Sequence, residues 1–330
     1  MSATIHCGTQ KNLARLARVL KRGGLVAVPT ETVYGLAANA LDAEACRRIF
    51  RAKRRPANDP LIVHVADLDT LSHIAVPNEA AAKLARAFWP GPLTMVMTRT
   101  AAVPDVVTSG LPSVAVRMPA HPLLRRLLKI CRLPLAAPSA NPFGYVSPTS
   151  AAHVLEGLGD AIDHILDGGP CRHGIESTIV DIRAPKRPIL LRPGVISAAQ
   201  LSKVLGVHVA NLSRRQVSRK PALAPGMLAR HYSPRRPLAL HRRITAAMVA
   251  RAGAGDVWIC FRKPSWAAAA PNVFWLSERG DLAEAGRRLF ALLRSLDRGR
   301  WIRLHAETAP SRGPGLAIND RLRRAAGFRS

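Results

Sequence analysis

Small hydroxyl and amide side chains follow two apolar stretches of the sequence. Thr30 and Thr32 come directly after one stretch, and Ser139 and Asn141 come directly after the other. Hydroxyl groups, amide groups and exposed backbone N–H groups are what a nucleotide phosphate or an adenine edge requires. Open α/β sheets usually bind ligands where their strands end, so both segments are candidate parts of a nucleotide site. A plain polar turn would have a similar composition, and neither segment is decisive alone.

Four cationic side chains stand at comparable places. Lys53 and Arg55 follow a helical pattern, while Arg117 and Arg192 each adjoin an apolar stretch. A guanidinium group is a planar fork that suits a carboxylate or a phosphate. For Arg117, a structural ion pair is an equally good interpretation. For Lys53 and Arg55, the alternative is a solvated helix end that complements the helix dipole.

Several well-known catalytic motifs are missing from the sequence. It contains no Gly-rich phosphate loop of the Walker kind, no Gly-x-Gly-x-x-Gly fingerprint and no nucleophile elbow. A covalent mechanism therefore has no obvious nucleophile. An electrostatic mechanism, in which cations neutralise a triphosphate and orient two small anions, is more economical.

The charge of the chain is strongly positive. There are 49 Lys and Arg residues against 21 Asp and Glu residues, giving a net charge of +28, and no acidic residue occurs from position 182 to 255. Such a surface attracts phosphate, anionic metabolites or RNA by direct contact. A GC-rich genome would explain the many arginines equally well, so charge alone does not choose a partner.

Length and composition indicate a globular protein of about two domains. The chain has 330 residues, 48% of them hydrophobic. No apolar run approaches the roughly 18 residues that span a bilayer, and the first twenty residues contain no secretory segment. We therefore expect no membrane insertion and a cytoplasmic location. The five cysteines include no close pair, which argues against both a disulfide framework and a zinc motif.

Helical and strand patterns alternate along the chain. The sequence is expected to open with an amphipathic helix that turns Leu13, Leu16 and Leu20 inward, and Asp42 is a good N-cap for a second helix. Further helices are predicted at 122–131, 150–158, 198–205 and 282–296. Strands are predicted at 25–28, 61–65, 93–97, 113–117, 133–137, 177–181, 189–191, 238–240, 257–261, 273–276 and 301–304. This order is typical of α/β domains.

Eight motifs in order resemble the YrdC-type threonylcarbamoyl-AMP synthases. They are Pro29-Thr-Glu-Thr-Val-Tyr-Gly35, Lys53-x-Arg55-Pro56, Pro60-Leu-Ile-Val-His64, Trp89-Pro-Gly-Pro-Leu-Thr94, Val116-Arg117-Met-Pro119, Pro138-Ser-Ala-Asn141, Ser177-Thr178 and Arg192-Pro-Gly194. Further on, Pro225-Gly226-Met227 and Arg230-His231-Tyr232-Ser233-Pro234 resemble the linker of the two-domain members. Together these motifs cover essentially the whole chain.

The resemblance implies a fold and a domain plan. Residues 1–208 would form the YrdC-like catalytic domain, a twisted open mixed sheet with flanking helices. Residues 209–237 would form a basic linker and active-site lid, which agrees with the long, Tyr-containing, arginine-rich segment found there. Residues 238–330 would form a smaller Rossmann-like three-layer α/β domain with a structural or regulatory role.

The resemblance also implies an activity. L-threonine, bicarbonate and ATP would be converted to L-threonylcarbamoyl-AMP and pyrophosphate, with Mg²⁺ accompanying ATP. The enzyme would be a nucleotidyltransferase in tRNA processing, and a downstream tRNA threonylcarbamoyl transferase would complete the modification of the adenosine beside the anticodon.

Roles for individual residues follow from the matched motifs. The residues implied to bind L-threonine or its carbamate are Thr32, His64, Arg117, Ala137 and Ser177. Those implied to bind ATP are Lys53, Arg55, Asp59, Ser113, Ser139, Asn141, Ser147, Arg192 and Tyr232. Lys53, Arg55 and Arg117 would act in catalysis, with Arg117 pairing the threonine carboxylate and Tyr232 closing over the nucleotide.

Two of these positions have alternative roles. Asp59 stands where the family commonly has Asn or Lys, so it would either coordinate Mg²⁺ or leave that place to Asn58. His64 is a candidate general base, but a lone histidine at a strand end is more often a binding or structural residue.

Two alternative functions remain at this point. The first is a non-catalytic protein that binds double-stranded RNA through its basic surface; aromatic residues are only 5% of the chain, which disfavours stacking on single strands. The second is carbamoyl transfer to an acceptor other than threonine. Threonine-dependent turnover of ATP separates both from the synthase.

Overall fold

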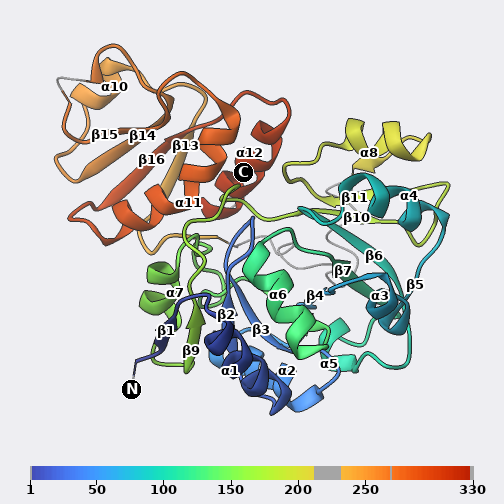
Figure 1. The fold of residues 1–330 in the computed structure, drawn as a ribbon. Helices are drawn as coiled ribbons and strands as arrows, with labels where there is room; N and C mark the ends of the chain where they lie inside the picture. The colour runs from blue at the N-terminus through green and yellow to red at the C-terminus, as the bar shows by residue number, and fades with distance from the viewer. Residues whose placement is uncertain (1, 212–231, 268–269, 328–330) are drawn as a thin grey trace.

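A computed structural model describes residues 2–211, 232–267 and 270–327, which form two α/β domains (Figure 1). The larger sheet is mixed and has the strand order β1-β9-β2-β3-β8-β4-β7-β6-β10-β11-β12, with β5 paired to β6. Its strands are β1 (Thr4–His6), β2 (Val26–Val28), β3 (Gly35–Asn39), β4 (Ile62–His64), β5 (Ala75–Val76), β6 (Leu93–Arg99), β7 (Ser113–Arg117), β8 (Leu135–Ala136), β9 (His164–Leu166), β10 (Thr178–Asp181), β11 (Ile189–Arg192) and β12 (Ala210–Asn211).

Helices flank this sheet and turn apolar stripes toward it. They are α1 (Gln10–Lys21), α2 (Ala43–Lys53), α3 (Leu68–Ile74), α4 (Glu79–Phe88), α5 (Asp105–Thr108), α6 (Pro122–Cys131), α7 (Ala151–Leu158) and α8 (Ala198–Leu205). In α1, Leu13, Leu16 and Leu20 are buried, as their 3.6-residue spacing predicts. The predicted mixed sheet with flanking helices is confirmed.

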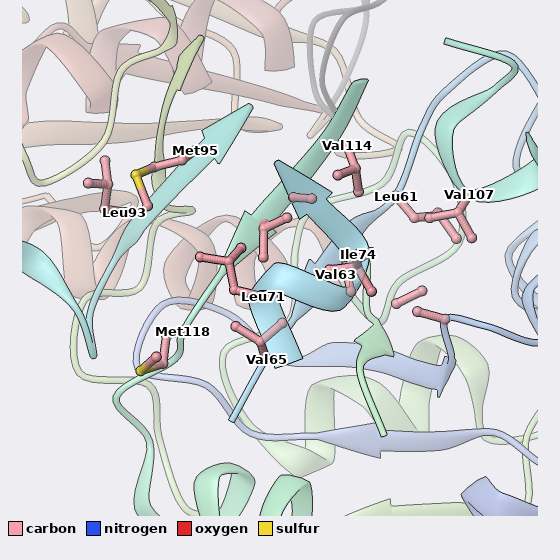
Figure 2. Packing of buried hydrophobic residues seen from close by; sticks show 14 of the residues in the cluster. Leu61, Val63, Val65, Leu71, Ile74, Leu93, Met95, Val107, Val114 and Met118 are labelled. Carbon is pink, nitrogen blue, oxygen red and sulfur yellow. The ribbon is translucent and has the colours of Figure 1, made fainter. Parts of the chain in front are cut away.

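Apolar side chains make up most of the core at the centre of the large sheet. Val63 on β4, Met95 on β6 and Val114 on β7 pack together with Leu71 and Ile74 of α3 (Figure 2). Strands buried on both faces read as continuous apolar runs, which is the pattern of these segments. This rigid centre carries His64 and Arg117, the last residues of β4 and β7.

The end of α2 determines where the first two cations lie. Asp42 caps the helix as predicted, with its side chain accepting from the N–H groups of Glu44 and Ala45. Arg54 then ends the helix in a left-handed conformation with φ of 52°. This turn reverses the chain between Lys53 and Arg55, so their side chains serve different parts of the molecule.

The second domain contains a four-stranded parallel sheet in three layers. Its strands are β13 (Leu238–His241), β14 (Asp256–Arg262), β15 (Val273–Ser277) and β16 (Arg303–Glu307), in the order β13-β16-β14-β15, and its helices are α10 (Ala246–Ala250), α11 (Leu282–Arg298) and α12 (Pro314–Ala325). Met248 and Val249 of α10 pack on one face against Trp258 and Cys260. Helices α11 and α12 pack on the other face. The smaller three-layer α/β domain is thus confirmed.

Two predictions about local structure need correction or lie outside the description. The chain does not open with a helix, because β1 precedes α1 and pairs with β9; three residues are too few to show a periodicity. Most of the proposed lid segment, residues 212–231, lies outside the described residues, including the Pro225-Gly226-Met227 and Arg230-His231 parts of the linker motif.

The cysteines are all unpaired thiols. Cys7 is exposed, and Cys46, Cys131, Cys171 and Cys260 are buried. Burial raises the pKa of Cys46, Cys171 and Cys260 to about 12, so these groups are not nucleophilic thiolates at neutral pH. Within the described ranges, the helices include none that is both long and apolar enough to cross a membrane.

Candidate functional site

A cavity lies where several strands of the large sheet end, and the space in and around it, part of which is open to solvent, measures about 490 Å³. The residues around it come from seven of the eight sequence motifs and from the linker motif. They are Thr30, Thr32, Val33, Tyr34, Gly35, Arg55, Ile62, His64, Arg117, Ala137, Pro138, Ser139, Glu176, Ser177, Arg192 and Tyr232. Nine of the residues singled out from the sequence therefore meet here: Thr32, Arg55, His64, Arg117, Ala137, Ser139, Ser177, Arg192 and Tyr232.

Arg117 is the central cation at one end of the cavity. Its Nη1 donates to Thr32 Oγ1 at 2.9 Å, its Nε donates to the Gly91 carbonyl at 3.2 Å, and its Nη2 lies 2.6 Å from Glu31 Oε1. Burial alone would raise the pKa of Glu31, but the Arg117 guanidinium outweighs it and holds that pKa below its usual range. Arg117 therefore combines the two features expected from the sequence. It makes a structural ion pair, and it also lines the cavity where a ligand could bind.

His64 lies beside Arg117 on the neighbouring parallel strand. The two residues are directly paired in the β4–β7 register. Burial, followed by the adjacent Arg117 charge, lowers the pKa of His64 to about 3, and its Nδ1 has no hydrogen-bond partner among the described residues. A neutral imidazole with an open nitrogen is suited to hydrogen bonding with a ligand, and it is a weak base.

A second cation, Arg192, stands over Ser177. Its Nε donates to the Ser177 carbonyl at 3.1 Å and its Nη2 donates to Ser177 Oγ at 3.1 Å. Ser177 Oγ also lies 2.7 Å from Thr94 Oγ1. The pKa of Arg192 is lowered, mainly because the guanidinium is buried. Arg192 is the last residue of β11 and Ser177 directly precedes β10; these two strands pair antiparallel, with Arg192 opposite Ile179, which brings the two side chains together.

Lys53 does not line the cavity but contacts the backbone of a loop that does. Its Nζ donates to the carbonyl oxygens of Ser139 and Asn141, each at 2.5 Å. Asn141 Nδ2 in turn donates to the carbonyls of Pro142 and Tyr145. Burial lowers the pKa of Lys53 well below its usual value. Lys53 therefore holds the 139–141 loop in place.

Arg55 reaches the cavity from a buried ion pair with Asp59. Arg55 Nη2 lies 2.8 Å from Asp59 Oδ2, and both side chains are almost completely buried. Arg55 also donates to the carbonyls of Asp59 and Pro60. Asp59 itself does not line the cavity, and neither do Lys53, Ser113, Asn141 and Ser147.

Ser113, Asn141 and Ser147 differ in how they relate to the cavity. Ser113 is the first residue of β7 and Arg117 is the last, so roughly 13 Å of strand separates their backbones. Ser147 Oγ donates to Glu176 Oε1 at 2.6 Å and supports a residue of the cavity wall. The Oδ1 atom of Asn141 is buried without a partner in the part of the chain that the structure describes.

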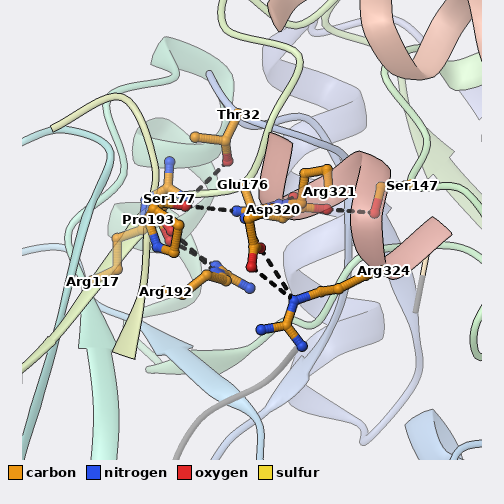
Figure 3. Close-up of polar contacts among 10 residues, drawn as sticks. All are labelled: Thr32, Arg117, Ser147, Glu176, Ser177, Arg192, Pro193, Asp320, Arg321 and Arg324. Atoms are coloured by element: carbon orange, nitrogen blue, oxygen red, sulfur yellow. Dashed lines mark hydrogen bonds and ion pairs between the residues drawn. The ribbon is translucent and has the colours of Figure 1, made fainter. Parts of the chain in front are cut away.

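Two carboxylates of the site were not singled out from the sequence. Glu31 lies within the first quoted motif and Glu176 directly precedes the Ser177-Thr178 motif, but nothing in their spacing distinguishes them from ordinary polar residues. Glu176 Oε2 accepts from Nε of Arg321 at 2.7 Å, so a residue of the second domain reaches this wall (Figure 3). The signal for Arg321 was faint: an arginine on the apolar face of α12, one position from Leu322.

Tyr232 closes another side of the cavity. Its ring stacks on Phe290 at 5.5 Å between centroids, and the Arg321 guanidinium lies 5.3 Å from the ring centroid. The side chain is 1% exposed although it belongs to the segment joining the domains. Residues 209–211 and 232–237 are thus the described parts of the predicted linker and lid, and Tyr232 lies at the site as expected.

The carboxylates of the site do not form a ready cage for Mg²⁺. Glu31, Asp59 and Glu176 are each ion-paired with an arginine: Arg117, Arg55 and Arg321. Across residues 2–211, 232–267 and 270–327, the search for three clustered His, Cys, Asp or Glu side chains finds no candidate metal site. Magnesium commonly takes much of its coordination from phosphates and water. The protein groups present fit a metal that enters with ATP rather than a resident ion.

Comparison with known proteins identifies the family. Residues 18–194 match the Sua5_yciO_yrdC family model, described as "Telomere recombination", and residues 196–327 match "Threonylcarbamoyl-AMP synthase, C-terminal domain". The threonylcarbamoyl-AMP synthase of Pyrococcus abyssi is 42% identical over 95% of this chain and 93% of its own length. That of Bacillus subtilis is 39% identical over 96% and 93%.

A solved structure agrees with the sequence relatives over both domains. The crystal structure of P. abyssi Sua5 complexed with L-threonine superposes with a TM-score of 0.91 at 40% identity, covering 99% of this chain and 98% of that one. The match spans the cavity and both sheets. It gives no support to the alternative of a non-catalytic RNA-binding protein. The chain therefore belongs to the threonylcarbamoyl-AMP synthase family.

Proposed function

We propose that this chain is a nucleotidyltransferase that converts L-threonine, bicarbonate and ATP into L-threonylcarbamoyl-AMP and pyrophosphate. The observation that carries the proposal is the pairing of two cationic centres in one cavity. Arg117, with Thr32 and His64, forms one centre, and Arg192, with Ser177, forms the other. Threonine carries one carboxylate and ATP carries a polyphosphate, so each substrate matches one centre.

Threonine binds at the Arg117 end. The guanidinium receives the substrate carboxylate, which competes with Glu31 for the same donors, and Thr32 Oγ1 keeps the fork oriented from 2.9 Å. His64 and Ala137 complete this end of the cavity. His64, with a pKa of about 3, is neutral here and binds through hydrogen bonds rather than serving as a strong general base.

ATP binds at the Arg192 end. Arg55, Ser139 and Arg192 contribute donors to the phosphates, and Tyr232 covers the nucleotide. Lys53 and Asn141 act indirectly by fixing the 139–141 loop, and Ser147 acts through Glu176. Mg²⁺ enters with ATP and supplies charge neutralisation on the phosphates.

The reaction needs two bond-forming steps. The deprotonated threonine amine attacks the carbon of bicarbonate or CO₂, which gives the carbamate and, from bicarbonate, a water molecule. A carbamate oxygen then attacks the α-phosphorus of ATP, the bond from the α-phosphorus to the bridging oxygen breaks, and pyrophosphate leaves. Both reactants are anions, so the buried arginines lower the barrier by holding them together and by stabilising charge on the leaving group.

From this product we infer a role in tRNA processing, with the cytoplasm as the proposed location. Threonylcarbamoyl-AMP is a mixed anhydride, and a separate tRNA threonylcarbamoyl transferase must pass its threonylcarbamoyl group to adenosine. We include direct contact between this protein and RNA in the proposal, because a net charge of +28 attracts the phosphates of RNA.

The test measures pyrophosphate release from ATP with and without L-threonine and bicarbonate, together with mass spectrometry of the adenylate. The wild-type chain is expected to release pyrophosphate only when both small substrates are present and to form threonylcarbamoyl-AMP, and Arg117→Ala to lose that product. Release that ignores threonine would point to another acceptor. A folded wild-type preparation without any release would overturn the proposal.

A further inference from the structure

The second domain contributes one buried cation to the wall of the catalytic cavity. Arg321 lies on α12, and its side chain is fully buried. Its Nε donates to Glu176 Oε2 at 2.7 Å, its Nη2 donates to the Pro193 carbonyl at 3.0 Å, and its Nη1 donates to Asp320 Oδ2 at 2.7 Å (Figure 3). Two of these three partners belong to the first domain.

The partner Glu176 is the only carboxylate among the residues that line the described cavity. One of its oxygens accepts from Ser147 and the other accepts from Arg321. An uncompensated carboxylate at this place would repel a polyphosphate, and in a low-dielectric site that repulsion is strong. Arg321 supplies the compensating charge from outside the cavity lining.

Glu176 would also compete for the nucleotide's own cation. It is close enough to Arg192 to influence the Arg192 pKa electrostatically, and it directly precedes Ser177, to which Arg192 donates. While Arg321 occupies Glu176 Oε2, Arg192 keeps its geometry over Ser177. Without Arg321, Arg192 becomes the nearest cation for that carboxylate, and a pair between them withdraws Arg192 from ATP.

The same guanidinium contacts two further parts of the wall. Its bond to the Pro193 carbonyl holds the residue that directly follows Arg192. Its position 5.3 Å from the Tyr232 ring centroid places it against the side chain that closes the cavity. One buried side chain thus fixes Glu176, the Arg192 segment and Tyr232 at once.

We propose that Arg321 is a positioning residue for ATP: it neutralises Glu176 and so keeps Arg192 available to the nucleotide. The proposal rests on the proposed function and gives the second domain a defined task in it. It predicts a selective effect, because the Arg117 end of the cavity, where threonine binds, has no contact with Arg321 among those that the structure describes.

The experiment compares steady-state kinetics of wild type, Arg321→Met, Glu176→Gln and the double variant. Arg321→Met is expected to raise the KM for ATP at least about tenfold, while the KM for threonine and kcat stay within about threefold. The double variant removes the charge that needed compensation and is expected to recover most of the lost ATP affinity. Arg323→Ala is the matched control, because Arg323 is an exposed arginine of the same helix.

The outcomes separate positioning from mere structural support. A general loss of stability would lower activity in Arg321→Met without a selective change in the KM for ATP, and Glu176→Gln would not rescue it; that result overturns the proposal. If Arg321→Met does not fold, the double variant supplies the uncharged case, and Arg321→Lys, which keeps the positive charge beside Glu176, is expected to stay within about threefold of the wild-type KM for ATP. Binding of a fluorescent ATP analogue to wild type and variants tests the inference even if no threonine-dependent product forms.

Discussion

Arg55 Nη2 lies 2.8 Å from Asp59 Oδ2 in a place where the two side chains are 2% and 0% exposed. The Asp59 carboxylate that the sequence suggested as a magnesium ligand is therefore already used in an ion pair. A buried carboxylate that already neutralises a guanidinium has little capacity left for a metal. Its main task is therefore to keep Arg55 charged and correctly aimed at the cavity.

Asp59→Asn is expected to destabilise the protein without changing its need for Mg²⁺. The substitution leaves the Arg55 charge buried and unpaired, which costs about 3 kcal/mol in the free energy of unfolding. Urea denaturation measures that loss, and a Mg²⁺ titration of turnover measures the metal dependence. Glu79→Gln, in the exposed Glu79–Lys83 pair, is the control and should leave stability unchanged. A shifted Mg²⁺ optimum in Asp59→Asn would restore the metal-ligand hypothesis.

Arg117→Lys should weaken threonine binding more than ATP binding. A lysine ammonium cannot reproduce the planar fork that reaches Thr32, Glu31 and the Gly91 carbonyl together. We expect the KM for threonine to rise by about ten- to a hundredfold, which corresponds to one or two lost charge-assisted hydrogen bonds. Initial-rate kinetics with each substrate varied in turn provide the measurement. Arg99→Lys, at the end of β6, is a control outside the cavity, and equal effects on both KM values would contradict this assignment.

His64 should make the protein less stable in acid. Its pKa is about 3 in the folded state against roughly 6.5 when unfolded, so the unfolded chain binds the proton more readily. Its contribution to the free energy of unfolding is complete above pH 6.5 and declines as the pH falls toward 3, by about 1.4 kcal/mol per pH unit.

The matching variant is His64→Gln, which cannot titrate in this range. The difference in unfolding free energy between pH 7 and pH 5 should shrink by about 2 kcal/mol relative to wild type. His153, whose pKa burial lowers to about 4, remains and supplies part of the residual slope. Unfolding curves that keep the full wild-type slope would show that His64 is not buried in neutral form.

Gly194→Ala should impair the Arg192 end of the site. A Cβ at this position would lie 2.3 Å from the backbone nitrogen of Thr178, so β10 and β11 would have to separate beside Ser177. We expect activity to fall at least about tenfold, with the KM for ATP affected, because small displacements of catalytic groups have large kinetic costs. Gly253→Ala is the control, since its Cβ would meet its nearest neighbour at 3.9 Å. Similar kinetics for both variants would show that the strands adjust freely.

The sequence was sufficient for those site residues whose position follows from one strand and its end. Arg117 and His64 each close a short apolar run, and parallel pairing of β4 and β7 brings them together without further information. Ser139 likewise follows an apolar segment, whereas Ser177 directly precedes one. Local patterns are informative here because the carboxyl ends of neighbouring parallel strands share one edge.

Other parts depend on contacts that no local pattern contains. Lys53 and Arg55 are two residues apart, yet the left-handed Arg54 sends one beneath the 139–141 loop and the other into the cavity. Helix α4 has an N-cap, Asn78, and buries one apolar face. It was nevertheless missing from the predicted helices, because the short α3 and β5 directly precede it and blur the start of its pattern. The Glu176–Arg321 pair joins positions 145 residues apart, and only packing of the two domains creates it.

Because Glu176 and Arg321 are 145 residues apart, they are also synthesised at different times. A ribosome completes the large sheet, including Glu176 and Arg192, well before it adds residue 321. Until α12 has emerged and packed, Glu176 keeps its hydrogen bond from Ser147 but lacks the Arg321 guanidinium that compensates its charge. Each new molecule therefore gains its nucleotide site after most of the sheet that carries it. A nascent chain interrupted before α12 would hold the correct strands and still repel the phosphates it is built to bind.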